Sequence, residues 1–95
     1  MYEVSAGVRS TRSEDGGIVL DLNQGKILRL NGIGAFIFER IRDRQNETEI
    51  IAEVSHTYGI PNRIVHSDVA DFLKSLEHQG LVMVSQGHAD DSQNG

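Results

Sequence analysis

The chain has 95 residues, of which 38% are hydrophobic, so it is long enough for one domain with a modest core and too short for a second. It has no run of about 18 apolar residues, and its first residues lack the basic and apolar regions of a signal peptide, which predicts a cytoplasmic protein without a membrane span. The absence of cysteine excludes disulfides, thiolate nucleophiles and cysteine-based zinc sites. The formal charge of −5 disfavours nucleic acid, because phosphate binding requires clustered lysines and arginines.

Residues 1–30 are predicted to form three strands, because apolar residues recur at alternate positions and breaks fall at 15–17 and 23–25. The alternating sets are Val4, Ala6 and Val8, then Ile18, Leu20 and Leu22, then Leu28 and Leu30. A three-residue loop over 23–25 is expected to set Leu20 opposite Leu28 and Ile18 opposite Leu30. The other face of the hairpin would then carry Val19, Asp21, Ile27 and Arg29.

From Asn31 onward the apolar period changes to about 3.6, which predicts three helices. Asn31 is placed to cap the first helix, whose apolar face is Ile33, Phe36, Ile37 and Ile41. Asn46 with Glu49, or Thr48 alone, can cap the second, which carries Ile50, Ile51, Val54 and Tyr58 and ends at Gly59. Pro61 opens the third, which ends at Gly80 and shows one stripe of Val65, Val69, Phe72, Leu73 and Leu76.

This order of elements predicts an α+β fold, in which a three-stranded antiparallel sheet is followed by three helices in a winged-helix-like arrangement. Residues 81–84 can return as a short edge strand. We expect a single domain over residues 1–84 and a disordered polar tail over 85–95, where no large apolar residue is available for burial.

Catalytic and metal-binding patterns are missing from the sequence. No two of the histidines share a helix at a spacing of three or four residues, as expected for paired metal ligands; they are His56, His66, His78 and His88. The Gly-x-Gly at 32–34 lacks the third glycine of a dinucleotide fingerprint and the Lys-Ser/Thr of a P-loop. The sequence therefore predicts a protein that is not an enzyme and holds no cofactor or metal.

The strand at 26–30 is the feature that indicates binding. It is short and carries apolar side chains on both faces, Ile27 on one and Leu28 and Leu30 on the other. An extended peptide can add to such a strand through main-chain hydrogen bonds, with pockets receiving alternate side chains. The alternative is that residues 81–84 already cover this edge.

Several segments together resemble the PqqD-like family. Residues 17–22, 28–31 and 34–38 are similar to the opening of these proteins, and residues 49–54, 58–60, 68–69, 72–73, 76 and 80–82 are similar to their later half. The resemblance implies a recognition element for ribosomally made, modified peptides. Such an element binds the leader region of a precursor peptide and serves a separate leader peptidase or modifying enzyme.

The hairpin pattern that runs from Asp21-Leu22 to Gly25-Lys26 resembles the stand-alone leader-binding proteins of lasso-peptide pathways. PqqD proper, a peptide chaperone for a radical-SAM enzyme, is a looser match. The resemblance implies that the leader adds to the third strand and lies against the third helix. The residues implied to contact it are Lys26, Ile27, Leu28, Arg29 and Leu30, with Val65, Asp68, Val69, Phe72 and Leu76.

The rotation of the third helix stays open at this point. If Val65, Val69 and Phe72 face inward, the residues left to contact the peptide are Asp68, Asp71 and Ser75. Two other functions are compatible with the order of elements: a winged-helix nucleic-acid binder, which the acidic third helix opposes, and a dimerising module that pairs through its exposed edge.

Overall fold

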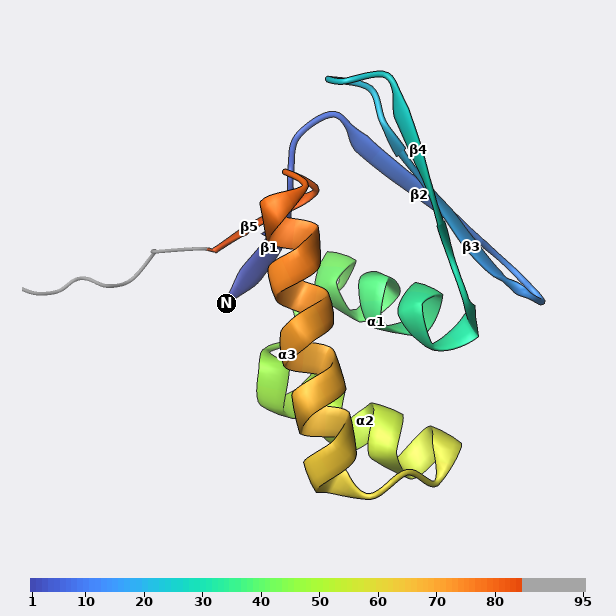
Figure 1. Ribbon diagram of the computed structural model, residues 1–95, viewed down its shortest axis with the longest axis vertical. Helices are drawn as coiled ribbons and strands as arrows, with labels where there is room; N and C mark the ends of the chain where they lie inside the picture. Colours follow the sequence, from blue (N-terminus) through green and yellow to red (C-terminus); the bar gives the residue numbers. More distant parts are fainter. Residues whose placement is uncertain (85–95) are drawn as a thin grey trace, which may run out of the picture.

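The computed structural model describes residues 1–84, and its architecture is the predicted α+β arrangement (Figure 1). Three antiparallel strands form a sheet in the order β2-β3-β4, and three helices follow it in the chain. The elements are β1 (Tyr2–Val4), β2 (Val8–Ser13), β3 (Gly16–Asp21), β4 (Lys26–Leu30), α1 (Gly32–Arg42), α2 (Glu47–Tyr58), α3 (Asn62–His78) and β5 (Val82–Val84). The predicted tail at 85–95 lies outside the described residues.

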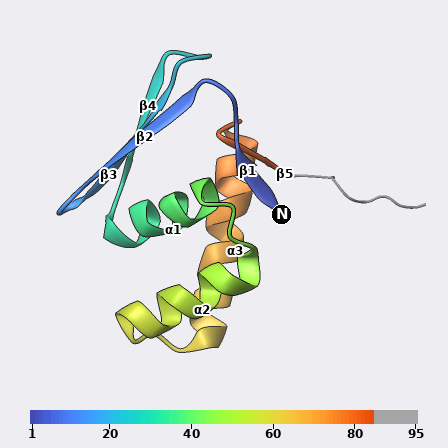
Figure 2. The same cartoon turned by 180° about the vertical axis from the view of Figure 1, so that it is seen from behind.

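The helices cover one side of the sheet. α1 lies next to the sheet, and α2 packs on the far side of α1 and against α3 (Figures 1 and 2). None of the helices within residues 1–84 is long and apolar enough to cross a membrane.

The prediction of one strand through Val4, Ala6 and Val8 is wrong, because the chain turns between β1 and β2. The Val8 amide donates to the Ser5 carbonyl at 3.2 Å, and Gly7 has a φ of +81°, which favours glycine. β2 then runs through the polar residues up to Ser13. β2 is an outer strand with one face in solvent, so its sequence does not need a strong apolar alternation.

The predicted register of the β3–β4 hairpin is also wrong. Val19 is opposite Leu28 and Gly17 is opposite Leu30, and the last pair is Asp21 with Lys26. The loop therefore holds four residues, 22–25, instead of three. A shift of one residue in pairing moves every side chain of β3 to the other face. Val19 is consequently buried, at 1% exposed, whereas Ile18 is 41% exposed.

Asp21 explains this register. Its side chain is only 2% exposed and its Oδ1 accepts the backbone N–H groups of Asn23 and Gln24 at 2.9 and 3.3 Å. An aspartate that bonds its own following amides starts a turn at its position. The hairpin therefore turns directly after Asp21, and the apparent apolar series at Ile18 and Leu20 lies on the outer face.

The helix boundaries follow their predicted signals. Asn31 Oδ1 accepts from the Gly34 amide at 2.7 Å, and Asn46 forms a reciprocal capping box with Glu49. Gly59 ends α2 in the left-handed conformation, with a φ of +66°. These contacts confirm the predicted starts of α1 and α2 and the predicted end of α2.

One hydrophobic core joins the helices to the inner face of the sheet. Its members from α1 differ from the prediction, since Phe38 is fully buried whereas Ile33 and Phe36 are only partly so. Phe36 instead packs edge-on against Tyr58, with ring centroids 5.7 Å apart. The buried members are Val8, Val19, Ile37, Phe38, Ile41, Ile50, Ile51, Val54, Val65, Val69, Leu73, Leu76, Leu81 and Val82.

The C-terminal strand β5 pairs with β1, with Tyr2 opposite Val84. Gly80, at a φ of +79°, turns the chain out of α3 into this strand. Burial raises the pKa of Tyr2, and the negative charges of Glu77 and Glu47 add to the effect. The β1–β5 pair lies beside α3, away from β4 (Figure 1), so β5 does not pair with the β4 edge. Leu81, just before β5, borders a small recess together with Leu28.

Candidate functional site

β4 is an edge strand of the three-stranded sheet. One of its sides pairs with β3, and no strand within residues 1–84 pairs with the other. Unpaired backbone N–H and C=O groups at a sheet edge are a template for an added strand, and proteins that do not use such an edge usually cover or charge it. The open side of β4 is therefore a candidate site for binding an added strand.

A groove of about 410 Å³ runs along this edge between β4 and α3. β4 contributes one wall, the start of α1 contributes the floor and α3 contributes the opposite wall. The lining residues are Leu28, Arg29, Leu30, Asn31, Ile33, Gly34, Ile37, Asp68, Phe72, Ser75 and Gln79. The groove thus has an apolar floor and carries one carboxylate, that of Asp68, on the helix side, whereas Arg29 is opposite Ile18 and its side chain belongs to the outer face of the sheet.

Gly34 allows the groove walls to approach the start of α1. A Cβ at this position would lie 3.5 Å from the tip of the Phe72 ring, 3.5 Å from Leu30 Cβ and 3.2 Å from the capping oxygen of Asn31. A larger side chain would extend into the groove between Leu30 and Phe72. The glycine that weakens the first turn of α1 therefore leaves room for the ring of Phe72.

The rotation of α3 divides the predicted helix residues into two sets. Val65, Val69 and Leu76 are fully buried in the core, while Asp68 and Phe72 line the groove. The groove face of α3 continues through Ser75, a contact expected only in the alternative rotation, and through Gln79, which was not predicted. This face runs at spacings of four, three and four residues beside the apolar stripe, as expected for a neighbouring face of one helix.

The strand residues of the predicted site divide in a similar way. Leu28, Arg29 and Leu30 border the groove, but only Leu28 and Leu30 are on the inner face. Arg29 and Ile27 are on the outer face, where Ile27 is 66% exposed. Lys26 and Ile27 border a smaller recess of about 50 Å³, which also includes Leu28 and Gln79. The floor residues from α1 had no separate signal in the sequence, because Ile33 and Ile37 belong to an ordinary helical stripe.

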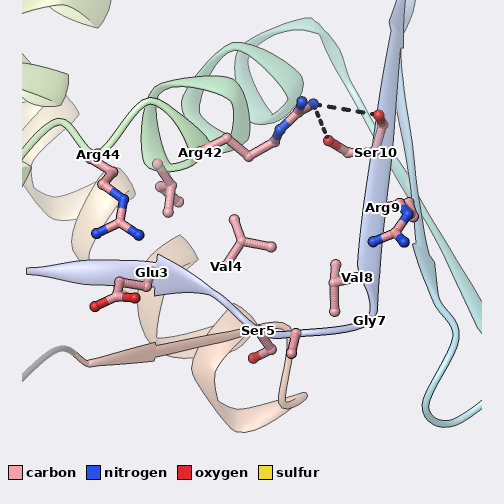
Figure 3. A pocket seen from close by; sticks show the side chains of 11 residues that line it. Glu3, Val4, Ser5, Gly7, Val8, Arg9, Ser10, Arg42 and Arg44 are labelled. Carbon is pink, nitrogen blue, oxygen red and sulfur yellow. Dashed lines mark hydrogen bonds between the residues drawn. The ribbon is translucent and has the colours of Figure 1, made fainter.

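A second cavity, of about 380 Å³, lies between the β1–β2 turn and the end of α1 (Figure 3). Arg42 reaches across it and donates from Nη1 to Ser10 Oγ at 2.9 Å and to the Ser10 carbonyl at 3.5 Å. Its lining includes no histidine and a single carboxylate, that of Glu3. The cavity therefore offers no general base with an orienting partner.

The titratable side chains within residues 1–84 form no metal-binding cluster. No group of three histidine, aspartate or glutamate side chains lies close enough to hold a metal ion in this part of the chain. His56, His66 and His78 are exposed on the helices, and His88 is outside the described residues. In these residues, the feature best suited to a ligand is the β4–α3 groove.

The fold and the groove define a class: a small winged-helix-like α+β domain with an open sheet edge beside its third helix. The model of one family, that of coenzyme PQQ synthesis protein D (PqqD), matches residues 16–82. The chain therefore belongs to the PqqD family. The match includes the hairpin, all three helices and the first residue of β5.

Two solved structures show the same fold. TbiB1 in complex with the TbiA(beta) leader peptide is 26% identical, with a TM-score of 0.79 over 93% of this chain and 99% of that one. A lasso peptide synthetase B1 complexed with the leader peptide is 19% identical, with a TM-score of 0.78 over 87% and 98% of the two chains. No curated protein matches the sequence. Membership of the family and the predicted fold class are thus both confirmed.

Proposed function

We propose that this chain binds the leader region of a ribosomally made precursor peptide in lasso-peptide biosynthesis. The observation that carries the proposal is the unpaired edge of β4 next to an apolar groove. Two structural relatives are complexes with leader peptides, and one of them is a lasso peptide synthetase B1. Both observations support a role in which an extended peptide is the ligand.

In the proposed mode of binding, the leader adds to β4 as a further antiparallel or parallel strand. Its backbone satisfies the free polar groups of β4, and alternate side chains enter the groove. Leu28 and Leu30 form the strand side of that groove and Phe72 forms the helix side. The remaining peptide side chains point to the outer face of the sheet, next to Ile27.

The expected affinity follows from the number of contacts that the groove and the strand edge can make with a peptide. Two buried anchor side chains contribute about 1.5–3 kcal/mol each, and a few strand hydrogen bonds contribute about 1 kcal/mol each. Loss of peptide freedom opposes these terms by several kcal/mol. The balance predicts a micromolar or somewhat lower Kd.

The chain acts in this proposal without making or breaking a bond. It delivers the leader to a separate leader peptidase or modifying enzyme, and so raises the local concentration of the precursor at that enzyme. The family match also favours a second candidate, a PqqD-type peptide chaperone for a radical-SAM enzyme. The two candidates share the groove and differ in the peptide and the enzyme.

The test is a fluorescence anisotropy titration of a labelled leader peptide, taken from the precursor gene next to the gene of this protein. Phe72→Ala should weaken binding by at least about tenfold, because the groove loses the apolar wall that buries one anchor side chain of the peptide. Phe36→Ala is the matched control, since Phe36 is also a partly buried helical phenylalanine but lies outside the groove. Failure of the folded wild-type protein to bind at tens of micromolar would refute the proposal for that peptide.

Strand addition has its own signature. Single N-methylation along the leader should weaken binding at every second residue of the bound segment, because only alternate amides of an added strand point toward β4. A pattern of losses with a period of three or four residues would instead indicate a helical ligand.

A further inference from the structure

The tip of the β3–β4 hairpin contains a buried charge. Asp21 is the one charged side chain that is buried within residues 1–84. Its Oδ1 atom accepts two backbone N–H groups of the turn, and its Oδ2 atom accepts from Gln24 Nε2 at 2.8 Å. A buried carboxylate is costly unless it is fully hydrogen-bonded, so this arrangement fixes the Gln24 side chain as well as the turn.

The same Gln24 nitrogen also reaches α3. It donates to the backbone carbonyl of Gln79 at 3.3 Å, so the two hydrogens of one amide serve Asp21 and Gln79. Gln79 is the C-cap of α3, where helix carbonyls lack an intrahelical donor. Among the hydrogen bonds of residues 1–84, this is the single one that joins the β3–β4 hairpin to α3.

The contact lies at one end of the groove. Gln79 lines both the groove and the adjoining small recess, and Leu28 borders the same two spaces from β4. At the other end, Phe72 and Leu30 approach each other over Gly34 without a polar contact. The two walls of the groove are therefore tied by hydrogen bonding at the Gln79 end alone.

We propose that Asp21 and Gln24 are positioning residues, which hold α3 against the β3–β4 hairpin and so fix the width of the groove before the peptide arrives. This inference rests on the proposed function. A groove that already has its bound width saves the ordering cost that a loose groove would add on binding. We name the chain of contacts from Asp21 through Gln24 to Gln79 the hairpin latch.

Three variants separate the latch from the stability of the hairpin. Gln24→Ala removes both bonds of the amide. Asp21→Asn keeps an oxygen for the turn amides but places an amide nitrogen against Gln24 Nε2. The hydrogen bond between the two side chains is then lost, or the Gln24 amide rotates so that its oxygen faces the new asparagine and its nitrogen no longer donates to Gln79. The double variant Asp21→Asn with Gln24→Glu restores a donor–acceptor pair inside the hairpin, yet a glutamate carboxylate cannot donate to Gln79.

We expect each of the three variants to bind the leader peptide about three- to tenfold more weakly, the range produced by the loss of one or two hydrogen bonds of ordinary net strength. The double variant should regain the hairpin stability that Asp21→Asn loses, without regaining affinity. Gln45→Ala is the matched control, because Gln45 also bonds an acidic side chain, that of Glu53 at 3.0 Å, but far from the groove. If the double variant binds like wild type, order in the hairpin is sufficient and the latch is refuted.

A measurement without peptide keeps the inference apart from the proposed function. The chain has no cysteine, so spin labels can be attached at Thr11→Cys on the outer face of the sheet and Lys74→Cys on α3. Both positions are exposed and outside the groove. The distance distribution between the labels should broaden in Gln24→Ala and in the double variant, but not in Gln45→Ala. Unchanged distributions would overturn the latch even if the leader peptide binds, whereas broadening without any peptide binding would leave the latch standing and refute the proposed ligand.

Discussion

The register of the β3–β4 hairpin decides which side chains of β3 face the core, and a pair of threonine substitutions tests it. Val19→Thr keeps the shape and the β-branching of the side chain and replaces one methyl group with a hydroxyl. Val19 is 1% exposed and lies in the hydrophobic core, so the new hydroxyl has no water to bond. A buried polar group without a partner costs about 1–3 kcal/mol, and Val19→Thr should lower the free energy of unfolding by that amount.

Ile18→Thr is the matched substitution on the neighbouring residue. Ile18 is 41% exposed on the outer face of the sheet, where a hydroxyl can bond water. Threonine retains the strand preference of a β-branched residue, and the lost apolar burial is small, so we expect a cost below about 1 kcal/mol. The two substitutions therefore differ because of the face they occupy.

Urea unfolding followed by circular dichroism measures both effects. The midpoints should fall in the order wild type, Ile18→Thr, Val19→Thr, with equal slopes of free energy against urea concentration. A larger loss for Ile18→Thr would place Ile18 in the core. In that case Ile18 instead of Val19 would share the inner face with Leu28 and Leu30, and Asp21 would lie on the outer face, where it could not position Gln24 as described.

Three further predictions concern stability. Asn46→Ala removes the capping box with Glu49 and should lower the unfolding free energy by about 1 kcal/mol in the same urea assay, whereas no change would contradict the cap. Gly16→Ala should prevent stable folding as judged by thermal melting, because φ is +151° and an added Cβ would collide with the Leu30 carbonyl oxygen; a wild-type Tm would show that this backbone is different. The pKa of Tyr2 is raised in the folded protein, so the unfolded chain loses the phenol proton first and the free energy of unfolding should fall as pH rises above about 10. The difference in unfolding free energy between wild type and Tyr2→Phe should therefore shrink there. A difference that stays constant between about pH 8 and 11 would exclude the shift.

The helices could be predicted well because their signals are local. The caps at Asn31 and Asn46 and the stop at Gly59 each depend on a few neighbouring residues, and all three are present in the structure. The apolar stripe of α3 was also correctly predicted as core for Val65 and Val69 in the alternative rotation. The sequence was sufficient wherever periodicity and capping acted on one element alone.

The strands were harder because their pairing is a property of two segments. Ile18, Leu20 and Leu22 alternate as a core strand would, and yet Val19 and Asp21 face inward. The residue that decides between the two registers is a buried aspartate, and an aspartate on the inner face contradicts the simple apolar pattern. Its hydrogen bonds to the following amides, which make its burial acceptable, exist only in the folded turn.

The candidate site shows the same limit. The open edge of β4 was recognisable from the sequence, and Ser75 was a candidate in one rotation of the third helix, but the floor from Ile33 and Ile37 and the part of the far wall at Gln79 were not recognisable. Those residues become a site because three elements meet, and Gly34 lets them meet closely.

The register correction itself connects fold and proposed function. By facing inward, Asp21 sets the turn so that Val19 shares the inner face with Leu28 and Leu30, and its second oxygen holds the glutamine that reaches α3. An alanine at this position would permit the alternative register, in which Ile18 and Leu20 face the helices. A single buried carboxylate thus selects the face that β3 turns toward the core and positions the glutamine beside α3, and this role accounts for a charged residue in the core of a domain with so little core to spare.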